Sequence, residues 1–219
     1  MSYIPIVPAV IPRNKEELLE LADRLLFSRE FHLDLVDGEF VPTVSWPFRP
    51  VGDPLEVKTA LDRYSLEVDL MVTDPIAVAK NWLKAGADAL VFHVETIGEE
   101  AFRNFADNTE EASVGVSAHG DTKLETLLAY AEAADYVQLM GIREIGAQGQ
   151  PFDEAVLDKI KSVKDRFPEM EVTVDGSVNK DTIKRLAEAG ADRFICGSAI
   201  VKQPDPEAAY RQLLSLINV

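Results

Sequence analysis

Short apolar runs alternate with amphipathic stretches along all 219 residues of the chain. Most runs are apolar throughout, as strands of a parallel sheet are when helices cover both faces. They predict eight strands, at residues 4–10, 31–36, 65–72, 87–93, 112–118, 136–140, 171–175 and 193–196. The stretches between them repeat apolar residues at helical spacing, so the pattern predicts a strand–helix unit repeated along the chain.

Residues that favour helix ends support this division. Five side chains are expected to cap helices that begin next to them: Asn14, Asp74, Asp121, Asn179 and Asp205. Asp74 and Asp205 each precede a proline, which suits the first helical position. The sequence Ala-Gly-Ala-Asp occurs at 85–88 and again at 189–192. Each copy indicates the end of a helix, because glycine readily adopts the left-handed conformation found there.

Repeated units of this kind in a chain of this length predict a (β/α)₈ barrel, an α/β fold, formed by residues 1–219 as a single domain. The alternative is an open doubly wound sheet, but no Gly-x-Gly-x-x-Gly turn follows the first strand. The least helical connections, at 37–53 and 141–152, follow the C-terminal ends of strands. Barrel enzymes carry their functional loops at those ends.

Composition and charge narrow the choice of partners. Hydrophobic residues make up 47% of the chain and charged residues 27%, which is typical of a globular protein. The single cysteine, Cys196, excludes an internal disulfide, and the chain begins without a signal peptide, so we expect a cytoplasmic protein. The net charge of −16 argues against nucleic acid or an anionic membrane as partner. An anionic ligand would therefore need local backbone N–H groups.

Polar residues lie at the ends of three predicted strands. In the strands predicted at 31–36, 65–72 and 171–175 these residues are His32, Asp34, Glu67, Asp69 and Asp175. Met71 lies on the same face as Glu67 and Asp69. Residues two apart on a strand project from the same face, and a barrel would bring the three strand ends together. The three strand ends together therefore suggest a metal or acid–base site. For His32 and Asp34, spacing alone favours the alternative of a solvated strand end.

Two Gly-Ser pairs follow the last two predicted strands. They are Gly176-Ser177 and Gly197-Ser198. Phosphate sites recur in barrels after the seventh and eighth strands, where backbone N–H groups face the ligand. The pairs therefore predict a phosphate site.

Several motifs occur in an order that resembles one family. They are His-Leu-Asp-Leu-Val-Asp-Gly-Glu-Phe-Val-Pro at 32–42, Leu-Met-Val-Thr-Asp-Pro at 70–75, Lys-Ala-Gly-Ala-Asp at 84–88 leading to Phe-His-Val-Glu at 92–95, Val-Asp-Gly-Ser-Val-Asn at 174–179, and Ala-Gly-Ala-Asp at 189–192 leading to Gly-Ser-Ala-Ile at 197–200. The chain resembles the ribulose-phosphate 3-epimerase family across essentially its whole length. The resemblance implies a barrel enzyme that interconverts ribulose 5-phosphate and xylulose 5-phosphate by moving one proton at carbon 3.

The resemblance also implies roles for individual residues. Asp34 and Asp175 match the acid–base pair that acts on opposite faces of the sugar, with one divalent metal stabilising the enediolate between them. The matching positions imply metal ligands at His32, Asp34, Asp69 and Asp175. They imply phosphate or substrate contacts at Ala9, Met71, Gly149, Gln150, Gly176, Ser177, Gly197 and Ser198. The family also implies a homo-oligomer with a small sugar-phosphate substrate.

The chain departs from the family at four places. Asp69 replaces the second metal histidine, and Ala9 replaces a serine on the first strand. The loop at 145–150 reads Ile-Gly-Ala-Gln-Gly-Gln where the family usually has Pro-Gly-Phe-Gly-Gly-Gln, with what looks like one additional residue before it. His119-Gly120 replaces Asn-Pro.

These changes leave three interpretations open. In the leading one the chain is an epimerase whose carboxylate-rich site suits Mn²⁺, Mg²⁺ or Fe²⁺ better than Zn²⁺. In the alternatives the substrate has shifted, or a non-catalytic member still binds a sugar phosphate. A related barrel lyase or synthase is disfavoured, because the third strand lacks Asp-x-Lys-x-x-Asp.

Five further residues have two interpretations or a purely structural one. His93 is either functional or a hydrogen-bonded barrel residue, and His119 either approaches the metal or is solvated. Trp46 either covers the barrel mouth or forms a subunit contact. Trp82 and Cys196 are expected to be buried packing residues.

Overall fold

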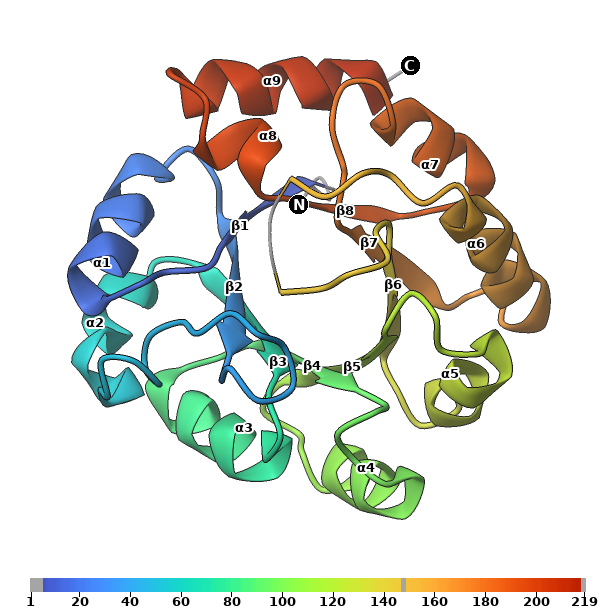
Figure 1. Ribbon diagram of the computed structural model, residues 1–219, viewed down its shortest axis with the longest axis horizontal. Helices are drawn as coiled ribbons and strands as arrows, with labels where there is room; N and C mark the ends of the chain where they lie inside the picture. The colour runs from blue at the N-terminus through green and yellow to red at the C-terminus, as the bar shows by residue number, and fades with distance from the viewer. Residues whose placement is uncertain (1–5, 147–148, 218–219) are drawn as a thin grey trace.

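The protein is a closed barrel of parallel strands surrounded by helices (Figure 1), as described by a computed structural model for residues 6–146 and 149–217. The strands are β1 (Ile6–Val10), β2 (Glu30–Val36), β3 (Ser65–Met71), β4 (Ala89–His93), β5 (Ser113–Ala118), β6 (Tyr136–Met140), β7 (Glu171–Asp175) and β8 (Arg193–Cys196). Each strand pairs with the next in sequence, and β8 closes the barrel on β1. The predicted (β/α)₈ fold is confirmed.

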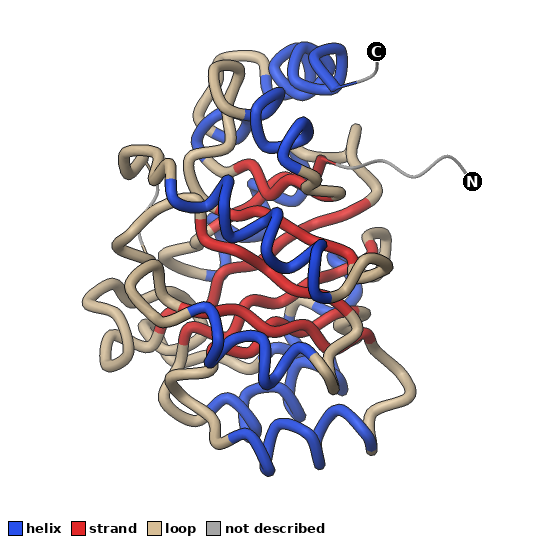
Figure 2. Tube along the Cα trace, turned by 90° about the vertical axis from the view of Figure 1, so that its right-hand side faces the viewer, coloured by secondary structure: helices blue, strands red, loops and turns tan. Residues whose placement is uncertain are grey.

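Helices form the outer layer around the strands (Figure 2). They are α1 (Lys15–Arg24), the 3₁₀ turn η1 (Pro54–Glu56), α2 (Lys58–Leu61), α3 (Pro75–Ala85), α4 (Glu99–Asp107), α5 (Leu124–Ala131), α6 (Ala155–Arg166), α7 (Ile183–Ala189), α8 (Ser198–Val201) and α9 (Pro206–Ile217). The main apolar core lies between these helices and the strands. No helix in the described part of the chain is long and apolar enough to cross a membrane.

Three of the five predicted caps form as expected. The side chains of Asn14, Asp74 and Asp205 accept hydrogen bonds from backbone N–H groups in the first turns of α1, α3 and α9. Gly86 and Gly190 end α3 and α7 with φ values of 98° and 111°. These left-handed conformations explain the glycine of both Ala-Gly-Ala-Asp sequences.

Two predicted caps are displaced from the helices. Asp121 does not cap α5, because a turn separates it from the first helical residue, Leu124, and no side chain caps that helix. The side chain of Asn179 accepts a hydrogen bond from Asp181 N–H at 2.9 Å, within a turn that precedes α7. Asn179 therefore organises the loop one turn before the helix.

The predicted strand boundaries agree with the structure to within two residues. Residues 4 and 5, assigned to the first strand, lie outside the described residues. The barrel interior differs from the apolar core outside it, since many inward-facing side chains are polar and buried: His32, Asp34, Glu67, Asp69, His93, Ser117, Gln138, Thr173 and Arg193. This polar interior carries the candidate site.

The loop that follows β2 is fixed by tryptophan packing. Trp46 is only 2% exposed and meets Trp82 of α3 edge-to-face, with 6.2 Å between ring centroids. Both predicted roles of Trp46, at the barrel mouth or in a subunit contact, are therefore wrong. Its ring lies in the core instead because Gly52, without a side chain, leaves room for it. Trp82 and Cys196 are buried, as predicted.

Candidate functional site

Four potential metal ligands converge inside the barrel. His32 and Asp34 of β2, Asp69 of β3 and Asp175 of β7 each offer one ligand atom, and these atoms all lie within 4.8 Å of one another. Asp34 and Asp69 are also partners in the register between β2 and β3. The structure thus brings together the four residues that the sequence singled out as candidate ligands.

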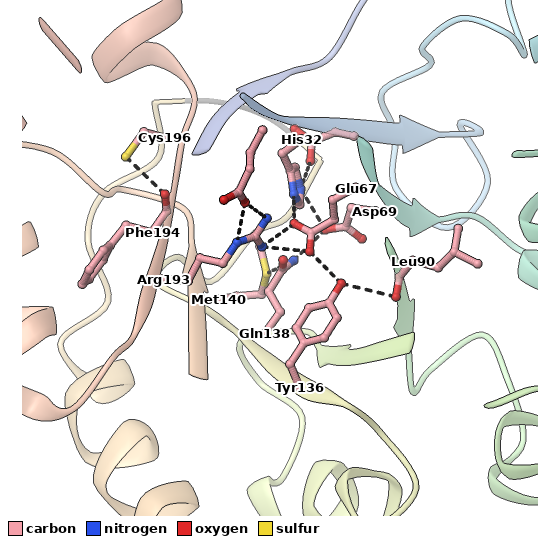
Figure 3. Close-up of polar contacts among 12 residues, drawn as sticks. His32, Glu67, Asp69, Leu90, Tyr136, Gln138, Met140, Arg193, Phe194 and Cys196 are labelled. Carbon is pink, nitrogen blue, oxygen red and sulfur yellow. Dashed lines mark hydrogen bonds and ion pairs between the residues drawn. The ribbon is translucent and has the colours of Figure 1, made fainter. Parts of the chain in front are cut away.

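His32 is fully buried, close to Glu67 and Asp69 (Figure 3). Its Nε2 atom is 3.1 Å from Asp34 Oδ1 and 3.8 Å from Asp69 Oδ2. Its Nδ1 atom is 2.5 Å from Glu67 Oε1. Burial lowers the pKa of an imidazole, but hydrogen bonds to these three carboxylates outweigh burial and hold the pKa of His32 well above 6.5.

The pKa values of the Asp34 and Asp175 carboxyl groups are both raised. Burial raises the pKa of Asp175 well above its ordinary value, and the charge of Asp34 raises it further. Burial also raises the pKa of Asp34, although the hydrogen bond and charge of His32 oppose this rise. Two neighbouring carboxyl groups with unlike surroundings can act as an acid and a base.

Asp69 shows the opposite shift and stays ionised. Burial alone would raise its pKa, but the charges and hydrogen bonds of His93 and His32 bring the pKa below its ordinary value. Its two oxygens accept hydrogen bonds from His93 Nε2 at 2.9 Å and from Gln138 Nε2 at 2.7 Å. These bonds fix the orientation of the carboxylate towards His32 (Figure 3).

The donor set fits a divalent cation. One imidazole and three carboxylates are close together, and all but the half-buried Asp175 are removed from solvent. Such a group is costly unless protons or a cation neutralise it. Oxygen-rich sites of this kind suit Mg²⁺ and Mn²⁺, and a single imidazole also suits Fe²⁺. The arrangement can therefore bind a metal and also exchange protons.

A cavity of about 210 Å³ opens next to Asp34 and Asp175. The eight residues that the sequence assigned to phosphate or substrate all line it: Ala9, Met71, Gly149, Gln150, Gly176, Ser177, Gly197 and Ser198. Hydrophobic side chains that the sequence did not single out also line it: Ile11, Met140, Ile142, Val178 and Ile195. Among the described lining residues none is lysine or arginine.

The turn after β7 has an unusual backbone. Gly176 and Ser177 both have positive φ, at 92° and 53°, and Ser177 is the one non-glycine residue with positive φ in the described chain. Ser177 Oγ donates to the carbonyl of Gln150 at 3.0 Å, so the turn contacts the loop that follows β6. Backbone strain of this kind concentrates at ligand sites.

The two histidines outside the donor group differ in position. His93 is fully buried beside Asp69, and its Nδ1 atom makes no hydrogen bond. His119 neither belongs to the donor group nor lines the cavity; its backbone N–H donates to Glu95 at 2.8 Å. The structure thus places His93 at the site and His119 outside it.

Three supporting residues were not identified from the sequence. Gln138 orients Asp69, and Arg193 and Tyr136 both bind Glu67. The alternation of Tyr136 and Gln138 along an otherwise apolar strand was a detectable signal, because both must face the same side of the sheet.

The chain is similar to known proteins over nearly its whole length. Residues 5–201 match the model of the family described as the ribulose-phosphate 3 epimerase family. The ribulose-phosphate 3-epimerase of Mycobacterium bovis is 30% identical over 213 residues, covering 95% of this chain and 90% of that protein. The ribulose-phosphate 3-epimerase of Bacillus subtilis is 32% identical over 189 residues, covering 83% of this chain and 84% of that protein. A crystal structure of a 3-hexulose-6-phosphate synthase has a TM-score of 0.72 at 21% identity, covering 98% of this chain and 100% of that one, and shares the fold.

Proposed function

Because the chain belongs to the ribulose-phosphate 3-epimerase family, and thereby to the isomerases, we propose that it is a metal-dependent ketose-phosphate 3-epimerase. Its substrates would be ribulose 5-phosphate and xylulose 5-phosphate, or a closely related pair. The observation that carries the proposal is the convergence of Asp34, Asp175 and two further ligands beside the cavity. Such a donor set favours catalysis over the alternative of a binding protein without activity.

One divalent metal would be held by His32, Asp34, Asp69 and Asp175. The three carboxylates favour Mn²⁺, Mg²⁺ or Fe²⁺ over Zn²⁺. When bound, the metal would supply positive charge to the enediolate oxygens. Asp69 would contribute a negative charge where the family has a neutral histidine.

Asp34 and Asp175 would move the proton at carbon 3. One carboxylate accepts that proton as the C3–H bond breaks, and the protonated partner donates a proton to the opposite face of the same carbon. For the reverse reaction the two groups exchange roles. Their raised pKa values support this assignment, because a carboxyl group with a raised pKa holds a proton more strongly than an ordinary one and is a stronger base when ionised.

The phosphate would bind at the strand ends after β7 and β8. Gly176, Ser177, Gly197 and Ser198 line the cavity there and offer backbone N–H groups. Gly149 and Gln150 would close over the ligand from the loop after β6. Since no basic side chain lines the described cavity, these local dipoles would supply the attraction.

The test is epimerisation of ribulose 5-phosphate by protein stripped with chelator and then supplied singly with Mn²⁺, Mg²⁺, Fe²⁺ or Zn²⁺. Turnover that depends on added metal and is highest with one of the first three supports the proposal. Folded protein that binds ribulose 5-phosphate but epimerises it with none of the metals overturns it in favour of the binding protein.

We also propose that the enzyme works in the cytoplasm as a homo-oligomer. The single cysteine, buried in β8, is compatible with a reducing compartment. Light scattering on protein eluting from a size-exclusion column measures the number of subunits directly. A monomer at all concentrations would contradict the proposed homo-oligomer.

A further inference from the structure

A network of charged groups inside the barrel joins Arg193 and Glu67 to His32 (Figure 3). Arg193 of β8 donates from Nη1 to both oxygens of Glu67 on β3, at 2.8 Å each. Its Nε and Nη2 atoms donate to Glu30 at the start of β2, at 3.1 and 2.8 Å. Tyr136 of β6 donates to Glu67 Oε2 at 2.6 Å. Glu67 is thus held from two further strands.

The oxygen of Glu67 that faces away from Tyr136 meets His32. Glu67 Oε1 lies 2.5 Å from His32 Nδ1, while His32 Nε2 faces Asp34 and Asp69. An ionised carboxylate can only accept hydrogen bonds, and arginine is always charged. With Arg193 and Tyr136 both donating to Glu67, the bond to His32 requires the proton to be on Nδ1.

Stability alone does not account for this network. Glu67 and Arg193 are 2% and 7% exposed, so both charges have lost most of their hydration. Apolar side chains of similar volume often stabilise a protein as well as a buried ion pair does. The position of the carboxylate, directly behind a candidate metal ligand, indicates a role in orienting that ligand.

We propose that Glu67 is a positioning residue for the metal site, held in place by Arg193 and Tyr136. It fixes the ring and tautomer of His32, so that the lone pair of Nε2 points at the group of ligand atoms formed with Asp34 and Asp69. The inference rests on the metal site of the proposed function. Carboxylates that accept the second N–H of a metal-binding histidine are a general device for raising metal affinity.

Gly115 of β5 allows the network to be tested without changing a charge, because it packs against Tyr136. A Cβ atom at this position would lie 2.4–2.8 Å from ring atoms of Tyr136, with which Gly115 is in register. The absent side chain therefore leaves the room that the Tyr136 ring occupies inside the barrel. Substituting Gly115→Ala should displace the tyrosine from Glu67 without changing any charge.

The main test is Glu67→Gln. The amide of the new side chain can donate to His32 Nδ1, which moves the imidazole proton to Nε2 and blocks metal binding there. We expect Mn²⁺ affinity, measured by calorimetry, to fall about 10- to 100-fold. The matched control is Glu99→Gln, which breaks an exposed Glu–Arg pair with Arg103 on α4 and should leave the affinity unchanged.

The tautomer itself is read by ¹⁵N NMR of the histidine rings in Zn²⁺-loaded protein. The chain has three histidines, so the signals are few. Wild type should show His32 protonated at Nδ1, and Glu67→Gln should lose that signal. A merely structural role for Glu67 would change the thermal stability and leave the tautomer as it is.

Two milder variants test the role of Glu67 if Glu67→Gln does not fold. Tyr136→Phe and Gly115→Ala each loosen Glu67 and should lower Mn²⁺ affinity by a smaller factor. If these variants fold and keep both the wild-type affinity for Mn²⁺ and the wild-type tautomer of His32, Glu67 is not a positioning residue. If wild type binds no divalent metal, the proposed function fails instead. The tautomer of neutral His32, measured in metal-free protein at high pH, then still decides whether Glu67 positions the ring.

Discussion

At the scale of single residues, protons and a metal compete for the same atoms. In the metal-free protein the pKa values of Asp34, Asp175 and His32 are all raised, by burial for the two carboxyls and by carboxylate hydrogen bonds for the imidazole. Only Asp69 has a lowered pKa and is ready to bind a cation. A divalent metal that binds here therefore competes with protons for the other three groups.

Metal affinity should consequently rise with pH. Each displaced proton makes the apparent Kd about tenfold tighter per pH unit until the pH exceeds the raised pKa of that group. Calorimetry of Mn²⁺ binding in buffers of different ionisation enthalpy counts the released protons. Asp175→Asn, which keeps the shape but cannot hold that proton, should release fewer. An affinity that does not change with pH would contradict this charge distribution.

The sequence reveals the site residues better than it reveals their partners. His32, Asp34 and Asp175 could be identified because the motifs at 32–42 and 174–179 resemble those of the family, whereas the spacing of His32 and Asp34 alone was also typical of a solvated strand end. Arg193 could not, because it lies 126 residues from Glu67 and the pairing depends on how the barrel closes. Such contacts become predictable only when the strand register is known.

At the scale of elements, strands were easier to predict than loops. Strands buried on both faces read as continuous apolar runs, and the eight runs correspond to β1–β8. The loop at 37–53 gave a misleading signal, because its tryptophan was expected at the surface. Trp46 instead joins the core through Trp82, a contact between segments that local patterns do not link.

Removing this contact should destabilise the barrel. Trp46→Ala leaves a cavity between the loop and α3, with an expected loss of about 3–5 kcal/mol in the free energy of unfolding. The matched control is Val51→Ala in the same loop, where the side chain is 89% exposed and the change should stay within about 0.5 kcal/mol. Urea denaturation measures both. Equal, small effects would show that the loop is not held by Trp46.

At the scale of the whole molecule, the negative net charge would repel an anionic ligand. The chain carries a charge of −16, and no basic side chain lines the described cavity. The sugar phosphate of the proposed reaction would therefore approach a protein of its own sign of charge, and only groups within the site would attract it. This arrangement differs from that of enzymes that steer anions with lysine and arginine.

Salt should therefore help the reaction. Screening of like charges predicts that kcat/KM for ribulose 5-phosphate rises, by roughly twofold, between about 10 and 150 mM ionic strength. Initial rates at low substrate concentration over a sodium chloride series measure the effect, and sucrose at matched viscosity should not reproduce it. A steady fall in kcat/KM with salt would indicate positive steering and contradict this account.

The most direct test of the account is deuterium exchange at carbon 3 in single-aspartate variants. Metal-loaded Asp34→Asn and Asp175→Asn should epimerise at least about 100-fold more slowly than wild type, since each lacks one proton carrier. In deuterated water the remaining aspartate should still exchange the proton on its own face. Each variant should then label only one of the two epimers, ribulose 5-phosphate or xylulose 5-phosphate, and the two variants should label opposite ones. Variants that fold and bind metal but label both epimers equally, or epimerise at the wild-type rate, would contradict the two-aspartate mechanism.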